Sequence, residues 1–340
     1  MEKHLRALHK SREALLKLPN VVGVGVGLKQ VGGESTGDYA LIIFVGKKIP
    51  PAGLSRAQQV PHRIEGLKTD VVEIGRVRLL DLRTRRERPA RPGMSIGHYR
   101  VTAGTFGAVV RDRASGEKLI LSNNHILANA TDGRDGRAAV GDPILQPAPY
   151  DGGREGDRIA TLLRFAPLQR SVRETDCPAA TAVIRMANML VHAVRPHYDL
   201  KMVKRQRAGN AIDAALARPV SPDLIDDDIL EVGRVNAVAG VAPGQEIMKS
   251  GRTSGLSRGK VMAVGVTLEV EIIDNERAWF VDQVVTDMAS SPGDSGSLVV
   301  DGQKRAVGLL FAGSDKYTIF NRMETVLSRL EVDIETAPGV

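Results

Sequence analysis

The chain has 340 residues, with 47 Lys and Arg against 40 Asp and Glu for a net charge of +7, and 42% of its residues are hydrophobic. This length exceeds one ordinary domain, and no apolar stretch reaches the roughly 18 residues that a membrane-spanning helix requires. Aromatic residues make up only 4% of the chain, which disfavours a protein that stacks single-stranded nucleic acid on aromatic side chains. The single cysteine, Cys177, excludes an intramolecular disulfide, and charges interrupt the N-terminus where a secretory signal would be apolar. We therefore expect a cytoplasmic location.

Residues 1–80 have the pattern of a small α+β domain. Residues 2–18 place four leucines on one helical stripe, which predicts an amphipathic helix. Strands are expected at 21–28, 39–45, 71–74 and 77–80. The first of them alternates Val with Gly, and a nucleotide-binding loop is a second interpretation of that pattern. No helix pattern and no Ser or Thr follow Lys29, so we favour a strand packed closely against a helix.

Residues 81–97 are rich in Arg and Pro, which predicts a linker. Its five arginines, and a second basic cluster over 201–207, supply much of the positive charge. Such runs bind phosphate backbones or anionic surfaces in some proteins, but a solvated segment is the more ordinary interpretation. We do not expect a nucleic-acid partner.

The remainder of the chain has short apolar runs separated by glycine-containing turns, which predicts antiparallel β structure over 98–235 and again over 236–340. Residues 178–194 break this pattern with a helical stripe and predict a helical insertion. Its apolar stripe is interpreted first as a packing face and second as a contact between copies of the chain. Asn321 is expected to cap a short C-terminal helix.

The sequence from Ser291 to Ser297 contains Gly-Asp-Ser-Gly directly before an apolar run. Glycines permit a tight turn that exposes the hydroxyl of Ser295, but a serine hydroxyl is a weak nucleophile unless a base and an orienting group assist it. His125 stands at the end of an apolar run, and Asp213 stands among apolar neighbours. The order His, Asp, Ser along the chain indicates a nucleophilic triad.

Four stretches of the chain, together and in this order, resemble the trypsin-like serine peptidases of the chymotrypsin fold, and more narrowly the bacterial relatives of the plant narrow-leaf proteins. These stretches are 121–128, 141–147, 249–255 and 292–308, and the resemblance covers roughly residues 90–335. It implies a mainly β fold of two antiparallel six-stranded barrels, here with the helical insertion and preceded by the small α+β domain. It also implies that the catalytic residues are His125, Asp213 and Ser295.

The resemblance further implies an oxyanion hole formed by the N–H groups of Gly293 and Ser295. The base of the substrate pocket would be Ala289, and its wall would be the strand with Phe311, Ala312 and Gly313. These stretches carry no carboxylate, so we expect cleavage after small or aliphatic residues.

Asp294 is expected to differ from its counterpart in secreted relatives. In those enzymes this carboxylate pairs with a new N-terminus that activation releases. Here the N-terminus belongs to a separate domain, so Asp294 requires another partner.

Asp176 is an alternative to Asp213, because 175–180 and 212–216 look like two versions of one pattern. Pro178 interrupts any strand that would carry Asp176 toward His125, whereas Asp213 runs into a strand without a break. We therefore favour Asp213.

The sequence as a whole predicts a serine endopeptidase that acts on protein or peptide substrates, without a cofactor, metal or membrane span, and with homo-oligomers allowed. The alternative is a binding or scaffolding protein that keeps the peptidase fold.

Overall fold

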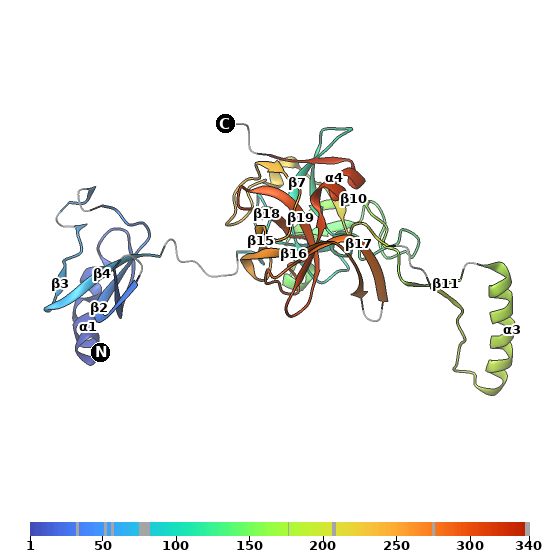
Figure 1. Ribbon diagram of the computed structural model, residues 1–340, viewed down its shortest axis with the longest axis horizontal. Coiled ribbons are helices and arrows are strands. Elements are labelled where there is room, and N and C mark those ends of the chain that lie inside the picture. The colour runs from blue at the N-terminus through green and yellow to red at the C-terminus, as the bar shows by residue number, and fades with distance from the viewer. Residues whose placement is uncertain are drawn as a thin grey trace. The chain divides into compact units, whose positions relative to one another are not determined.

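The computed structural model describes residues 1–31, 34–50, 53–55, 58–74, 82–175, 177–205, 209–273 and 276–336. The chain divides into two compact units, Met1–Leu80 and Asp81–Val340, which are drawn in Figure 1 and are treated separately below. No helix in the described ranges is long and apolar enough to cross a membrane.

The N-terminal unit is a small α+β domain in which one helix packs on a mixed sheet. It comprises α1 (Glu2–Leu16), β1 (Val21–Val31), β2 (Glu34–Val45), β3 (Arg63–Ile64) and β4 (Leu67–Glu73), with the strand order β1-β2-β4-β3. Leu8 and Leu15 of α1 are buried against Leu41 and Ile43 of β2. The Val and Gly alternation therefore forms a strand, and the strand expected at 77–80 lies outside the described residues.

The segment expected to be a linker packs instead on the second unit. Ala90, Met94 and Ile96 are fully buried, and the N–H of Ala90 donates to the carbonyl of Leu224 at 2.8 Å. Three arginines of this segment form ion pairs within the same unit: Arg83 with Glu231, Arg86 with Asp157, and Arg91 with Asp228. Composition does not reveal this arrangement, because the apolar residues that carry the packing are few and are spaced among charges.

The first sheet of the second unit contains eight strands in the order β21-β7-β8-β13-β10-β9-β5-β6. Its elements are β5 (Ser95–His98), β6 (Gly104–Thr105), β7 (Ala108–Asp112), β8 (Lys118–Ser122), α2 (Asn124–Leu127), β9 (Pro143–Leu145), β10 (Arg158–Phe165), β13 (Ala215–Pro219) and β21 (Val332–Ile334). Short 3-10 turns occupy Pro149–Asp151, Glu155–Asp157 and Pro222–Leu224. Because β5 and β21 come from outside 98–235, the sheet is larger than the six strands expected.

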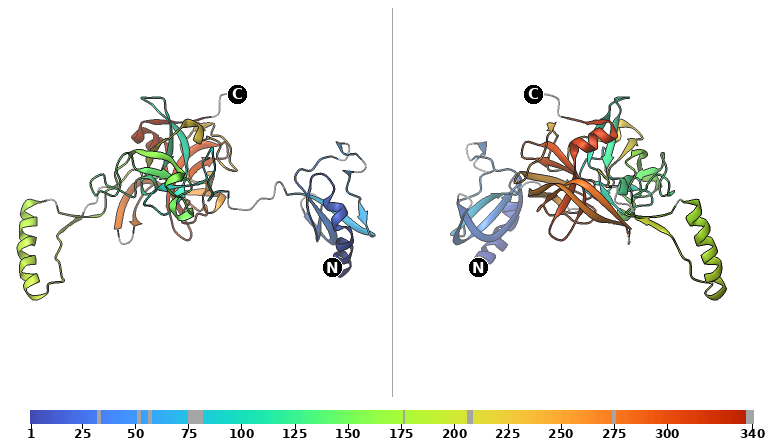
Figure 2. Two further views of the ribbon diagram at one scale, coloured as in Figure 1. Left: turned by 180° about the vertical axis from the view of Figure 1, so that it is seen from behind. Right: turned by 45° about the vertical axis from the view of Figure 1, so that its right-hand side comes forward.

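The second sheet closes on itself. Its elements are β14 (Ala237–Val238), β15 (Glu246–Gly251), β16 (Gly255–Ile273), β17 (Glu276–Thr286), β18 (Leu298–Asp301), β19 (Arg305–Gly313) and β20 (Thr318–Arg322), followed by α4 (Met323–Leu330). The strands follow the order β14-β19-β18-β15-β16-β17-β20, and β20 also pairs with β19. The ring from β19 round to β20 therefore has six strands, and Figure 2 shows the strands of this unit curling. The mainly β prediction is confirmed.

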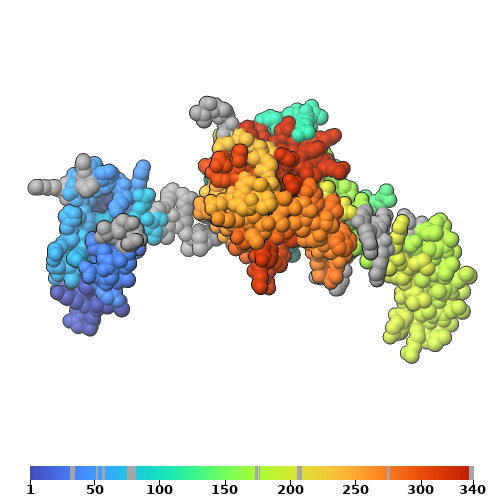
Figure 3. All heavy atoms as spheres, in the orientation of Figure 1, coloured from blue at the N-terminus to red at the C-terminus, as the bar shows by residue number. Residues whose placement is uncertain are grey.

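The helical insertion lies between two short paired strands. α3 (Pro178–Val194) has the bounds expected from the sequence, and β11 (Val172–Glu174) pairs with β12 (Val203–Arg205) at its base. No described side chain of α3 is buried, and its yellow-green atoms lie open on the face drawn in Figure 3. The apolar stripe is therefore not a packing face within the described residues. Cys177, just before α3, is exposed rather than buried.

One hydrophobic core joins the two sheets of the second unit. It includes Leu121 of β8 and Leu216 of β13 from the first sheet, and Leu298 of β18 and Leu309 of β19 from the second. These strands lead directly into or out of the stretches with His125, Asp213 and Ser295. The shared core therefore fixes the three stretches relative to one another.

Candidate active site

His125 and Asp213 are in direct contact. His125 lies in the short helix α2, which follows β8, and Asp213 comes two residues before β13, the strand that pairs with β8. The carboxylate Oδ2 of Asp213 lies 2.5 Å from Nδ1 of His125, and Oδ1 accepts the backbone N–H of His125 at 3.2 Å. Asp213 is buried, whereas the imidazole remains one-fifth exposed. This contact holds the ring with its other nitrogen, Nε2, free to exchange a proton.

Two buried asparagines hold the backbone of Asp213. The side chain of Asn321 accepts the N–H of Asp213 at 2.8 Å, and the side chain of Asn123 donates to the carbonyl of Asp213 at 2.7 Å. Asn321 in turn donates to Oε1 of Gln283 at 2.7 Å. Asn321 was expected to cap the C-terminal helix, but α4 begins at Met323 with Arg322 as its N-cap, and the side chain of Asn321 contacts Asp213 instead. Only tertiary contacts identify this role.

Ser295 lies in a tight turn that packs against the first sheet. The N–H of Thr105 in β6 donates to the carbonyl of Ser295 at 2.8 Å. Gly296 has a φ of +94°, and a Cβ at this position would lie 2.1 Å from Oγ of Ser122, so only glycine fits here. The hydroxyl of Ser295 points to the carbonyl of Phe311 at 3.4 Å. The hydroxyl is therefore directed to Phe311 rather than to His125 here, and a catalytic hydrogen bond of this kind commonly tightens only when substrate is present.

The N–H groups of Gly293 and Ser295 donate to no acceptor among the described residues. The carbonyl of Asp294 accepts the hydroxyl of Ser297 at 2.5 Å and its N–H at 3.0 Å. Because a trans peptide is planar, the N–H of Ser295 points the opposite way. The N–H of Asp294, between the two, donates to Ser291 at 2.9 Å. In the described part of the chain neither free N–H meets an acceptor, so the pair can bind a negatively charged oxygen.

Asp294 has Lys249 as its partner. The ammonium of Lys249 lies 2.6 Å from Oδ2 of Asp294, and both side chains are fully buried. The carboxylate also accepts the Ser254 hydroxyl at 2.5 Å and the N–H groups of Thr253 and Ser291, each at 2.9 Å. Burial alone would raise the pKa of Asp294, but the charge of Lys249 and these hydrogen bonds outweigh it and lower the pKa. Lys249 is thus the partner that Asp294 requires in place of an N-terminus.

A cleft of about 460 Å³ brings the three residues of the predicted triad together. His125, Asp213 and Ser295 line it, together with Phe311, Ala312 and Gly313 of β19. Of the predicted site residues that the structure describes, Gly293 and Ala289 do not line this cleft, and Ala289 is exposed.

The same cleft contains two carboxylates that the sequence did not bring to attention. Glu269 and Glu271 lie on β16, far along the chain from the pocket stretches, and both are exposed. Glu269 accepts the hydroxyl of Ser171 at 2.7 Å and lies 4.0 Å from a guanidinium nitrogen of Arg277. The rim of the cleft is therefore acidic on the β16 side.

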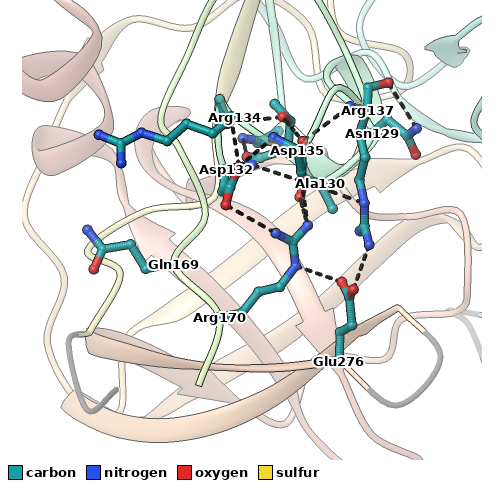
Figure 4. A network of polar contacts seen from close by, with 12 residues as sticks. Asn129, Ala130, Asp132, Arg134, Asp135, Arg137, Gln169, Arg170 and Glu276 are labelled. Carbon is teal, nitrogen blue, oxygen red and sulfur yellow. Dashed lines mark hydrogen bonds and ion pairs between the residues drawn. The ribbon is translucent and has the colours of Figure 1, made fainter. Parts of the chain in front are cut away.

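A polar network, shown in Figure 4, ties the loop after α2 to β17. The guanidinium of Arg170 lies 2.7 Å from Oδ2 of Asp135 and 2.7 Å from Oε2 of Glu276, and Arg137 lies 2.6 Å from the other oxygen of Glu276. Burial opposes ionisation of Asp135, but hydrogen bonds from Thr131 and Arg170 prevail and lower its pKa to about 2. The network holds the loop near His125 against the strand that carries Phe280 into the cleft.

Asp176, the alternative partner of His125, lies outside the described residues. Among the residues that are described, no group of three or more His, Cys, Asp or Glu is arranged to hold a metal ion.

Comparisons with known proteins give distant relatives. No family model matches the chain. The protein NARROW LEAF 1 from Oryza sativa subsp. japonica is 24% identical over 92% of this chain, which spans 57% of the length of that relative. Among solved structures, Thermobifida fusca protease A is 14% identical with a TM-score of 0.46, and a Nocardiopsis protease is 17% identical with a TM-score of 0.45. Each match covers 73% of this chain and 100% of the other. The solved structures that the chain resembles are thus serine proteases of the chymotrypsin fold.

Proposed function

We propose that the chain is a serine endopeptidase that cleaves protein or peptide substrates. The observation that carries this proposal is one cleft lined by His125, Asp213 and Ser295, next to two backbone N–H groups that meet no acceptor among the described residues. A scaffold gains nothing from a histidine that is held by a buried carboxylate in the same cleft as a partly exposed serine. We therefore favour the enzyme over the binding protein.

In the proposed reaction, Oγ of Ser295 attacks the substrate carbonyl while Nε2 of His125 takes its proton. Asp213, bonded to Nδ1, holds the tautomer and stabilises the imidazolium that forms. The N–H groups of Gly293 and Ser295 stabilise the oxyanion. His125 then protonates the leaving amine, and water releases the acyl group from Ser295 by the same steps.

The architecture of β19 and β20 supports a preference for a small or aliphatic residue before the cleaved bond. Gly313 and Thr318 are paired in the sheet, so the two strands close on each other after a short turn. The hydroxyl of Ser290 lies 2.6 Å from that of Thr318 across this region. A long side chain would have to separate these groups, whereas a methyl or isopropyl group would not.

A fluorophosphonate probe tests the reaction class, because it labels only an activated serine. We expect labelling of the wild-type chain and none of Ser295→Ala, whose thermal unfolding should be nearly unchanged because a single hydroxyl contributes little to packing. Equal peptide hydrolysis by the two proteins would refute the proposal. Absence of labelling in a well-folded wild-type protein would favour the scaffold.

A digest of denatured protein tests the specificity, with Ser295→Ala as the control. We expect cleavage after Ala, Val and similar residues. Cleavage mainly after Arg or Lys would contradict this preference and would point to Glu269 and Glu271 as the selecting groups.

A further inference from the structure

We propose that Thr253 is a positioning residue for the oxyanion hole, where its hydroxyl holds the carbonyl of Pro292 and thereby aims the N–H of Gly293. This inference rests on the proposed peptidase function. Thr253 touches neither substrate nor Ser295 in this role, and acts through the backbone of the turn before the nucleophile.

Thr253 bonds to the chain on both sides of Gly293. Its Oγ1 lies 2.8 Å from the carbonyl oxygen of Pro292, and its N–H donates to Oδ1 of Asp294 at 2.9 Å. Since the Pro292–Gly293 peptide is planar and trans, a carbonyl held toward Thr253 directs the N–H of Gly293 to the opposite side. In the described chain no other group donates to this carbonyl.

The direction of the Thr253 hydroxyl follows from a second contact. Nη1 of Arg252 donates to Oγ1 of Thr253 at 2.9 Å, and a guanidinium has no acceptor to offer in return. The single hydroxyl proton of Thr253 is therefore left for the carbonyl of Pro292. Arg252 is itself held by Asp151, whose Oδ2 accepts its Nε at 2.9 Å. The hydroxyl is thus oriented before any substrate arrives.

Each of the three successive carbonyls in this turn is held by a different hydroxyl. Thr253 holds Pro292 at 2.8 Å, Thr105 holds Gly293 at 2.8 Å, and Ser297 holds Asp294 at 2.5 Å. The Pro292–Gly293 peptide is the one most able to reverse, because Gly293 has a φ of +99° and glycine accepts either sign of φ. A reversed peptide would place a carbonyl oxygen where the oxyanion should bind.

Thr253→Val tests this role because it keeps the shape of the side chain and removes the hydroxyl. With acetyl-Ala-Ala-Pro-Ala p-nitroanilide as substrate, we expect kcat to fall, up to the about 10²- to 10³-fold that loss of one oxyanion donor costs, while KM changes little. Inhibition by the matching peptide aldehyde, whose hemiacetal oxygen occupies the hole, should weaken in parallel. Thr253→Ser keeps the hydroxyl and should restore both values.

Thr181→Val is the matched control. The hydroxyl of Thr181, in α3, also donates to a backbone carbonyl at the surface, that of Cys177, at 3.0 Å. It should leave kcat and aldehyde inhibition unchanged. Undiminished turnover in Thr253→Val, with an active wild type, would overturn the role of Thr253. Equal losses in Thr253→Ser and Thr253→Val would also overturn it, since they would show a packing effect.

A crystal structure of Thr253→Val separates failure of this inference from failure of the proposed function. If the wild-type chain neither reacts with a fluorophosphonate nor hydrolyses peptides, the peptidase proposal fails, but the orientation of the Pro292–Gly293 peptide is still measurable. A reversed or doubly occupied peptide supports the role of Thr253. A carbonyl that keeps its direction in the variant refutes it.

Discussion

Lys249→Met should destabilise the second unit strongly, because it leaves the carboxylate of Asp294 buried without its counter-charge. Both side chains are fully buried and lie 2.6 Å apart. Removing one partner of a buried ion pair typically costs about 3 to 5 kcal/mol, against a total stability of about 5 to 15 kcal/mol for a domain. The hydroxyl of Ser254 and three backbone N–H groups still solvate Asp294. We therefore expect the lower part of that range, about 3 kcal/mol.

Urea unfolding followed by the fluorescence of Trp279 provides the measurement. Trp279 is the only tryptophan of the chain and lies in β17, so the signal reports on the second unit without interference from the first. The double variant Lys249→Met with Asp294→Asn should lose less stability than the two single variants added together, because no net charge is then buried. A loss below about 1 kcal/mol in Lys249→Met would refute the reasoning, since it would match a solvated surface pair.

Three further predictions concern the surroundings of the triad. Asp213→Asn should lower turnover by up to about 10⁴-fold because the histidine adopts the wrong tautomer, whereas Asp176→Asn should lower it far less. The opposite ranking in purified, folded variants would make Asp176 the triad acid. Asn321→Ala removes the acceptor for the backbone N–H of Asp213, so it should lower the free energy of unfolding by about 1 to 3 kcal/mol and should also lower kcat. An unchanged kcat would show that Asp213 is held in place without Asn321. Arg170→Met removes a cation that, together with the Thr131 hydroxyl, lowers the pKa of Asp135 and that also lowers the pKa of Glu276. The stability lost should therefore be full above about pH 5 and should shrink as the pH falls through about 2, where Asp135 becomes protonated in the folded chain too. A loss in urea stability that does not change with pH between 2 and 6 would contradict this assignment.

The sequence by itself determined the mainly β class and the local chemistry of the site. Alternating and apolar runs specify strands through contacts between near neighbours, and the helical stripe over 178–194 marks α3 to the residue. The Gly-Asp-Ser-Gly turn is also local, because the positive φ of Gly293 and Gly296 is a property of single residues. His125 and Asp213 were recognisable in the sequence because each is a polar residue next to an apolar run, and such residues commonly lie at the ends of buried strands.

Only the tertiary structure decided which distant groups complete the site. Lys249 and Thr253 stand in the stretch 249–255 that carries the resemblance, but their roles, like that of Asn321, appear only when β15, β20 and the turn after β15 pack around the nucleophile. Likewise, the Arg and Pro content of 81–97 predicts a linker, whereas Ala90 is held by an isolated bridge to Ile225, which lies far along the chain. Burial and partnership depend on contacts between residues remote in sequence, and neither composition nor periodicity contains them.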